Sequence, residues 1–445
     1  MKNLGIHLCR GLGEVALVLL ILLLPLPRHW PLVEQRYPGV NAELTSLNLY
    51  LSDFAVLLLV AAVAIPWPRR RQWSLPGPRA LTHPLALLVL LASMSSLWAL
   101  DLVLVLQHAL RLAILLALVL ALIRLQPDER LLQVSLALTV VLQAAVALLQ
   151  FNWQDDLGLR WLGEISLNRY PGGGSILTVA DQYWLRGYGL TPHPNILGGI
   201  LALALLTLVV AFLQSRPRWR PLWLIVLLAG TAGLFISFSR SAWLGSVVGG
   251  AFLVVAILLR QPWRQRYGRP LLVLILASGL LFSGLAWQQR HLLLARSNPD
   301  SSVREARSIN ERSALNAAAM ALIRLAPLTG VGAGNSAVAA IPLVGDTPGV
   351  APQPAHLAPL LLTAELGIAG GALWLWLMLL PAALALVRHR QGKLTLWALG
   401  LTAALLAFAV IDLFDYYAWG WQQGRLLRWL YWALWAAATT VSSKQ

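Results

Sequence analysis

The stretch PAHLAPLLLTAELG places His356 at the start of an apolar run and Glu365 nine residues further on, with no other charged residue between them. An imidazole whose pKa lies near neutrality can take a proton from an attacking hydroxyl, so His356 is our candidate general base. The alternative is a structural histidine, the commoner role of a lone His beside an apolar run. Nine residues are about two and a half helical turns, so Glu365 would lie opposite His356 on a shared helix. We therefore expect Glu365 to orient another group or to cap a turn.

Three arginines stand beside apolar runs in WLRGYGLTPHPNILGG, SFSRSAWLG and INERSALNAAA, namely Arg186, Arg240 and Arg312. A guanidinium group near the bilayer is energetically costly unless it is paired or lines a wet cavity. Ser237, Ser239 and Ser241 flank Arg240, and these groups together could bind phosphate through charge-assisted hydrogen bonds. The alternative for Arg240 is a side chain that extends to the membrane surface.

Further polar or flexible residues accompany these candidates. His193 and Asn195 flank Pro194, which favours an extended His193, and Asn195 can cap the helix that follows. Gly332 and Gly334 in PLTGVGAGNS permit close approach of the backbone to a ligand. No strand pattern precedes these glycines, so neither a dinucleotide fingerprint nor a P-loop is predicted. We treat all four residues as possible supporting members of one site.

Asp412 and Asp415 lie about one helical turn apart in IDLFDYYAWGWQQGR. We expect them to pair with Arg425 or with an arginine of an outer loop rather than to hold Mg²⁺. The acids of the chain are not joined by His or Cys residues at a metal-binding spacing. The sequence therefore predicts neither a metal site nor a cofactor, and the single Cys9 excludes an internal disulfide.

The rest of the chain must position these groups in or beside a membrane. Its 445 residues are 58% hydrophobic and only 12% charged, with a mean hydropathy of +0.69. Apolar runs of about 17 to 25 residues recur, which is typical of an all-α polytopic membrane protein, and they lack the alternation of β-barrel strands. We predict one transmembrane domain over residues 1–445, in which the first apolar run is a retained span rather than a signal peptide. The predicted membrane-spanning helices, about twelve, are 12–27, 48–66, 83–100, 103–123, 131–151, 196–214, 222–238, 242–260, 270–287, 366–387, 394–411 and 426–441.

The charges sort by side of the membrane under this topology. The net charge is +16, and the whole excess falls on the termini and on the connections from even-numbered to odd-numbered spans. The positive-inside rule makes that side cytoplasmic, so both termini are predicted to be cytoplasmic. A basic face against anionic lipid then explains the charge, and nucleic-acid binding is not predicted.

Two outer segments, 152–195 and 288–365, are too long to be simple connectors, and loops of this length usually carry function. Within the second segment, Val303 to Leu325 has helical spacing, and Pro327 ends the pattern. We predict that this helix forms an outer cap just before the tenth span. Its candidate buried stripe consists of Ile309, Leu315, Ala319 and Leu322.

Taken together and in order, four segments resemble the signatures of the O-antigen ligase and O-antigen polymerase superfamily. They are RGYGLTPHPNILG, SFSRSAWLG, NERSALNAAAMALIRLAPLTGVGAGN and PAHLAPLLLTAELG. The similarity runs from about Arg186 to the C-terminus and includes the span count and a large outer loop before span ten. The N-terminal half matches only in hydropathy.

The resemblance implies a metal-independent, inverting glycosyltransferase with a GT-C-like fold, in the bacterial inner membrane, with its active site on the periplasmic side. Its donor would be an undecaprenyl-diphosphate-linked glycan. By position, Arg186 and Arg240 match arginines that hold the diphosphate, Arg312 matches an arginine of the large loop, and His356 matches the general base. Where the family often has Asn after this His, the chain has Leu357.

The resemblance leaves the acceptor open. It is lipid A–core in a ligase, another lipid-linked repeat in a polymerase, and a protein hydroxyl in a protein O-oligosaccharyltransferase. The span count and the size of the outer loop favour a ligase. A transporter of lipid-linked sugar would need charges through the bilayer midplane and paired halves, and only Arg111 is deeply placed. A non-catalytic scaffold would not explain the arginines and the histidine.

Overall fold

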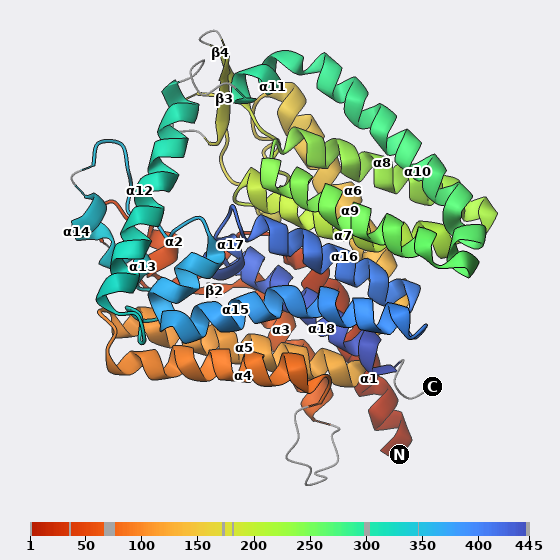
Figure 1. Cartoon of the computed structure of the whole chain (residues 1–445), viewed down its shortest axis with the longest axis horizontal. Helices are drawn as coiled ribbons and strands as arrows, with labels where there is room; N and C mark the ends of the chain where they lie inside the picture. Colours follow the sequence, from red (N-terminus) through yellow and green to blue (C-terminus); the bar gives the residue numbers. More distant parts are fainter. Residues whose placement is uncertain are drawn as a thin grey trace.

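The computed structural model describes residues 2–34, 37–65, 76–170, 174–179, 182–297, 303–345 and 347–441. Helices dominate these residues, which confirms the predicted class of all-α polytopic membrane protein. Most of the long helices run in roughly the same direction in Figure 1 and form one bundle. The strands in the described ranges form two short antiparallel hairpins, β1–β2 and β3–β4.

The N-terminal part of the chain precedes the second hairpin. Its elements are α1 (Lys2–Leu23), β1 (His29–Val33), α2 (Ala42–Thr45), β2 (Leu47–Tyr50), α3 (Leu51–Ala64), α4 (Arg79–Met94), α5 (Leu102–Leu125) and α6 (Glu129–Trp153).

The C-terminal part begins with the second hairpin and contains the four segments that resemble the O-antigen ligase and polymerase superfamily. Its elements are β3 (Ile176–Val179), β4 (Gln182–Leu185), α7 (Pro194–Gln214), α8 (Arg220–Ile236), α9 (Arg240–Leu259), α10 (Gln261–Gln288), α11 (Arg290–Ser297), α12 (Val303–Leu325), α13 (Ser336–Ala339), α14 (Ile341–Val344), α15 (Ala358–Arg390), α16 (Leu396–Ile411), α17 (Tyr417–Gly420) and α18 (Gln422–Val441).

Each predicted span coincides with a helix, in order α1, α3 to α10, α15, α16 and α18. Among the described residues, 8 helices are long and apolar enough to cross a membrane, α4 to α10 and α15. The helices α3 and α16 are apolar but shorter. The number of helices that cross the bilayer therefore stays a prediction.

The centre of the bundle is formed by α7, α16 and α18. Helix α16 packs against α7 and α9 on one side and against α18 on the other. Three tryptophans of α18, Trp429, Trp432 and Trp435, are fully buried, and α7 is buried on nearly every side. This packing brings the start of α7, the start of α9 and the end of α16 to the same end of the bundle.

Helix α15 is broken at Gly367, where φ is 70° and ψ is −175°. A Cβ at this position would collide with the carbonyl oxygen of Leu328. The segment that follows α12 pairs with α15 at the break. Ile368 N–H donates to the Pro327 carbonyl oxygen (2.9 Å), and Val331 N–H donates to the Ala364 carbonyl oxygen (2.9 Å). The predicted tenth span begins at this break, and the helical turns over 358–366 form a separate segment ahead of it.

Helix α12 crosses the left-hand ends of neighbouring helices in Figure 1 and packs against α15. The predicted helix is present over Val303–Leu325, while its role as an outer cap stays a prediction. Leu315, Ala319 and Leu322 of the predicted stripe are buried, at 1%, 5% and 5% exposure. Ile309 is 45% exposed, so its assignment to the stripe was wrong.

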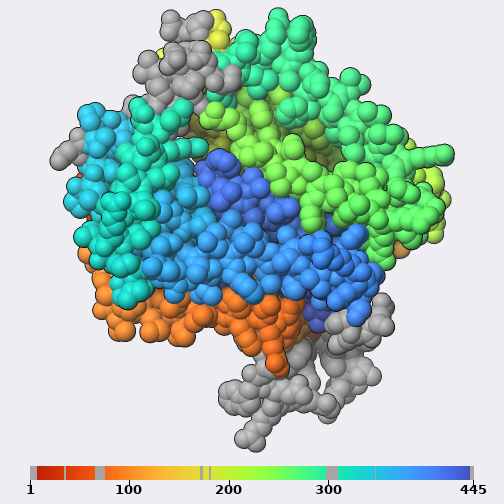
Figure 2. Space-filling view, in the orientation of Figure 1, coloured from red at the N-terminus to blue at the C-terminus, as the bar shows by residue number. Residues whose placement is uncertain are grey.

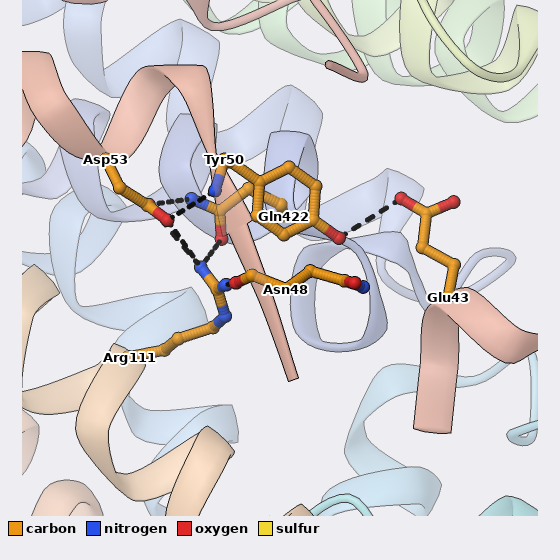
Figure 3. A network of polar contacts seen from close by, with 6 residues as sticks. All are labelled: Glu43, Asn48, Tyr50, Asp53, Arg111 and Gln422. Carbon is orange, nitrogen blue, oxygen red and sulfur yellow. Dashed lines mark hydrogen bonds and ion pairs between the residues drawn. The ribbon is translucent and has the colours of Figure 1, made fainter. Parts of the chain in front are cut away.

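Arg111, the arginine placed deepest by the sequence, lies in a buried polar network (Figure 3). It donates hydrogen bonds to Asp53 Oδ2 (3.3 Å) and to Gln422 Oε1 (2.9 Å). It also donates to the Asn48 carbonyl oxygen, and its guanidinium carbon lies 4.7 Å from the centroid of the Tyr50 ring. Arg111 therefore ties α3, α5, α18 and β2 together.

Asp412, at the end of α16, forms a fully buried ion pair with Arg428 of α18. The carboxylate also accepts a hydrogen bond from Trp374 Nε1 (3.2 Å), and the guanidinium carbon lies 4.0 Å from the centroid of the Phe408 ring. The sequence predicted Arg425 or an arginine of an outer loop as the partner. The structure corrects this to Arg428, about one turn further along α18, because the packing of α18 turns that face toward α16.

We predict that Asp412→Asn lowers the free energy of unfolding by roughly 3 to 5 kcal/mol, because Arg428 stays buried without a counter-charge. Thermal unfolding of the purified protein in detergent measures the loss. The control is Glu14→Gln, which removes an exposed pair with Arg10 and should change stability by about 1 kcal/mol or less. Similar small shifts for the two variants would contradict the importance of the buried pair.

Candidate active site

One cavity of about 320 Å³ brings together most of the residues singled out from the sequence. Figure 2 shows the surface hollowed between α12 and α9, with the dark-blue C-terminal segment on its floor. Contributions come from α9, α12, the start of α7, the segment before α15 and the segment after α16. The sequence-predicted residues on its wall are Arg186, His193, Asn195, Arg240, Arg312, His356 and Asp415.

Arg186 follows β4 and is buried. Its Nε donates to the Ser237 carbonyl oxygen (2.8 Å), Nη1 donates to Ser175 Oγ (2.9 Å) and Nη2 donates to Asn195 Oδ1 (2.7 Å). These three contacts fix the plane of the guanidinium group. Arg186 therefore brings a positive charge to the wall and positions Asn195.

The residue that caps α7 is His193 rather than the predicted Asn195. His193 Nδ1 accepts a hydrogen bond from the backbone N–H of Asn195 (3.1 Å). The Asn195 side chain instead accepts from Arg186 and donates to Asp415 (3.1 Å). Ser241 Oγ donates to the same carboxylate (2.9 Å). Arg186, Asn195, Asp415 and Ser241 thus form a continuous polar chain beneath the cavity.

The serines beside Arg240 do not form the predicted set of phosphate donors. The hydroxyl groups of Ser239 and Ser241 lie 3.3 Å apart, and Ser241 donates to Asp415. Ser237 Oγ donates to the Leu234 carbonyl oxygen (2.7 Å), and all three serines are buried. Their hydroxyls therefore stabilise the protein, and the charge offered to an anion here is that of Arg240.

Arg240 and Arg312 line both the cavity and an adjoining hollow of about 280 Å³. Arg296 of α11 lines both spaces too, and its carbonyl oxygen accepts a hydrogen bond from Arg240 Nη1 (3.1 Å). The exposed apolar side chains of Leu244 and Phe414 border the adjoining hollow. Positive charge is therefore concentrated where the cavity meets apolar surface.

His356 precedes α15, and its ring lies edge-on to the Tyr416 ring with the centroids 5.1 Å apart. Burial, together with the positive charge of Arg312, lowers the pKa of His356 from 6.5 to about 3. The imidazole is thus neutral at physiological pH, and Nδ1 has no hydrogen-bond partner among the residues that the structure describes. A neutral imidazole with an unshared nitrogen can accept a proton, as a general base must.

Glu365, Gly332 and Gly334 lie against one another, apart from the residues that line the cavity. Glu365 accepts hydrogen bonds from the Gly334 N–H (2.7 Å) and from Ser336 Oγ (2.7 Å). Gly332 and Gly334 have φ of 100° and 74°, and a Cβ at Gly334 would collide with the His108 ring. The glycines therefore allow close approach of the chain to itself, where the sequence predicted approach to a ligand.

Several cavity residues were not singled out from the sequence. Two of them are next to a residue that was, since Glu311 precedes Arg312 and Tyr416 follows Asp415. Closeness in sequence to a candidate residue was the signal that could have identified them. A polar residue in a polar segment is otherwise indistinguishable from a solvent-exposed one. The additional wall residues include Arg296, Glu311, Gln353, Tyr416 and Trp421.

The charged wall favours an anion. Four arginines and two carboxylic acids, Glu311 and Asp415, line the cavity. Within the described ranges, no three His, Cys, Asp or Glu side chains are grouped so that they could hold a metal ion. Guanidinium groups bind phosphate oxygens in bidentate geometry, so this arrangement can hold a doubly charged phosphate or diphosphate group.

We predict that Glu365→Leu destabilises the fold but leaves the turnover of folded protein nearly unchanged. The buried Gly334 N–H and the Ser336 hydroxyl would lose their acceptor, at about 1 to 3 kcal/mol for each. Thermal unfolding and activity per folded molecule measure the two effects, with Glu14→Leu on α1 as the control. A variant with normal stability and no turnover would place Glu365 in the chemistry instead.

Comparison with known proteins agrees with the resemblance of the four segments. The family model described as O-antigen ligase matches residues 224–375. The matched segment contains Arg240, Arg312 and His356, whereas Arg186 and Asp415 lie outside it. No curated protein matches the chain. Residues 224–375 therefore match the O-antigen ligase family.

Proposed function

We propose that this chain is an inverting glycosyltransferase that moves a glycan from an undecaprenyl-diphosphate carrier to the lipid A–core, as an O-antigen ligase does. The family match supports the transfer of a glycan. One observation carries the finer proposal: arginines that suit a diphosphate share a single cavity with a neutral imidazole.

The diphosphate of the donor is assigned to the arginine side of the cavity. Arg240 and Arg312 are the more exposed candidates, and Arg296 stands beside them. As the glycosidic bond breaks, negative charge develops on the leaving diphosphate, and positioned guanidinium groups stabilise that charge. Arg186 adds positive charge from the wall, while its protein contacts hold Asn195 in place.

The polyprenyl chain is assigned to the apolar edge of the adjoining hollow. Leu244 on α9 and Phe414 after α16 are both exposed there, next to Arg240 and Arg312. A carrier lipid would keep its chain among such side chains in the bilayer while its diphosphate enters from the side. The apolar side chains next to the arginines match the apolar chain and the charged diphosphate of such a lipid.

The chemical step is assigned to His356. The acceptor hydroxyl attacks the anomeric carbon of the donor sugar, the bond from that carbon to the diphosphate oxygen breaks, and undecaprenyl diphosphate leaves. The neutral imidazole takes the hydroxyl proton. Attack from the face opposite to the leaving group inverts the configuration at the anomeric carbon.

Two groupings of charge support a site on the periplasmic side of the inner membrane. Arg130, Arg216 and Arg266, from predicted cytoplasmic connections, line one pocket together with Trp219. The arginines of the predicted outer segments line the separate cavity described above. Arginines that the sequence assigns to the same side of the membrane therefore lie together in the structure.

We predict that His356→Ala loses glycan transfer but still binds undecaprenyl diphosphate, because the base is separate from the anion site.

Arg240→Ala should weaken this binding by roughly 10-fold or more, the scale of a charged hydrogen bond. Titration of the lipid and mass spectrometry of the glycan product with lipid A–core as acceptor measure the two properties. The controls are His83→Ala and Arg10→Ala on exposed helix surfaces. Normal transfer by His356→Ala would overturn the base assignment, and a product joined to another acceptor would overturn the ligase assignment.

The low pKa of His356 predicts an unusual pH dependence. The acid limb of kcat/KM reports the free enzyme, so it should lie below about pH 5 rather than near 6.5. Bound diphosphate brings negative charge toward the imidazole and raises its pKa, so the acid limb of kcat should lie at higher pH.

Stability must be measured alongside these rates. Below pH 6.5 the unfolded chain binds protons that the buried His356 resists, so stability falls as the pH is lowered. The folded fraction at each pH therefore corrects the rates. A kcat/KM limb at pH 6.5 in fully folded protein would contradict the structure.

A further inference from the structure

One part of the cavity wall, next to His356, consists of acidic, amide and aromatic residues rather than arginines. The Tyr416 hydroxyl donates to Gln353 Oε1 (3.3 Å), and Gln353 Nε2 donates to Glu311 Oε1 (3.3 Å). Trp421 lines the same cavity. We name these four residues, Glu311, Gln353, Tyr416 and Trp421, the polar wall. They come from α12, from the segment before α15 and from the chain around α17.

The polar wall lies away from the apolar edge of the adjoining hollow. The adjoining hollow with its apolar edge shares Arg240, Arg296 and Arg312 with the cavity. No residue of the polar wall lines that hollow, and His356 does not line it either. The arginines therefore stand between the apolar edge and the polar wall, and the imidazole, which packs on Tyr416, lies on the side of the wall.

The proposed reaction places the acceptor on that same side. In an inverting transfer, the attacking hydroxyl and the leaving group lie on opposite faces of the sugar ring that reacts. The diphosphate belongs with the arginines, so the attacking hydroxyl must approach from the other direction. The base must reach that hydroxyl, and this requirement again selects the side of His356.

The groups of the polar wall suit a carbohydrate. A carboxylate, an amide and a phenol offer both acceptors and donors for sugar hydroxyls, and an indole ring can pack on the apolar face of a pyranose. Burial raises the pKa of Tyr416 to about 12, so the phenol keeps the proton that it donates to Gln353. The contacts on both ends of Gln353 fix the plane of its amide, which preorganises the wall for a ligand.

We propose that the polar wall is the subsite for the sugar unit that carries the acceptor hydroxyl, and that this unit is a neutral or amino sugar. The inference rests on the proposed function and deepens it. Glu311 sets the charge preference, because its carboxylate accepts hydrogen bonds from hydroxyl or ammonium groups and repels a phosphorylated sugar.

The test uses the full-length protein in lipid nanodiscs with an undecaprenyl-diphosphate-linked glycan as donor. The acceptor is lipid A–core that ends in a neutral sugar. Glu311→Gln keeps an oxygen for the Gln353 contact but removes the charge, and Gln353→Leu removes the amide. The matched control is Gln391→Leu, an exposed glutamine beyond the other end of α15.

Both wall variants should raise the KM for the acceptor by about 10-fold, the scale of lost hydrogen bonds to charged or fixed groups. The affinity for undecaprenyl diphosphate should stay within about twofold, because the arginines are untouched. Glu311→Gln should also narrow the difference in KM between neutral and phosphorylated terminal sugars. The control should match the wild type.

Other outcomes overturn the subsite. An unchanged acceptor KM in folded Glu311→Gln would show that the polar wall does not bind the acceptor. A parallel loss of lipid binding and acceptor binding would show that the wall only supports the cavity. Failure of the wild type to bind undecaprenyl diphosphate would overturn the proposed function, and the subsite with it. Arg240→Ala separates these cases, since it should weaken lipid binding and leave the acceptor KM nearly unchanged.

Discussion

The cavity depends on a chain of buried contacts that runs from Arg186 through Asn195 to Asp415 and Ser241. A buried guanidinium group is unfavourable without partners, so the three protein contacts of Arg186 determine where β4, α7 and the end of α8 meet. Asn195 passes the constraint to Asp415, which lies after α16. The ends of helices far apart in the sequence are thereby held around one space, and Arg240 begins α9 at its rim.

Charge in this cavity couples donor binding to base strength. The same Arg312 that is proposed to meet the diphosphate also lowers the pKa of His356. In the empty cavity the pKa of His356 is low, first because burial disfavours the charged imidazole and second because Arg312 is positively charged. In the proposed mechanism an arriving dianion would offset the contribution of Arg312, so His356 would become a stronger base when the donor binds. Such coupling would limit abstraction of protons from water when no donor is bound.

Hydropathy revealed the helices because the length of a spanning helix is set by the bilayer and is written in consecutive residues. Isolated polar residues in apolar runs, such as Arg186, Arg240 and His356, were equally visible, and the structure places them in one cavity. Their partners were not visible. Asp412 pairs with Arg428 instead of Arg425 because tertiary packing sets the rotation of α18. Glu311 and Gln353 sit in polar segments, where nothing in the sequence separates a wall residue from a solvated one.

Glu365, Gly332 and Gly334 were recognised in the sequence as unusual residues, but the sequence did not show which groups they contact. A carboxylate in an apolar run predicts a partner, and here the partner is the chain itself. Glu365 holds the loop around Gly334 against the first part of α15, and the break at Gly367 separates that part from the remainder of the helix. The Ala358 N–H donates to the Asp412 carbonyl oxygen (2.8 Å), which ties the start of α15 to the end of α16. His356 precedes Ala358 by two residues, so these contacts place the imidazole against Tyr416. The two ends of the PAHLAPLLLTAELG segment therefore have separate roles, since His356 lines the cavity and Glu365 stabilises the loop around Gly334.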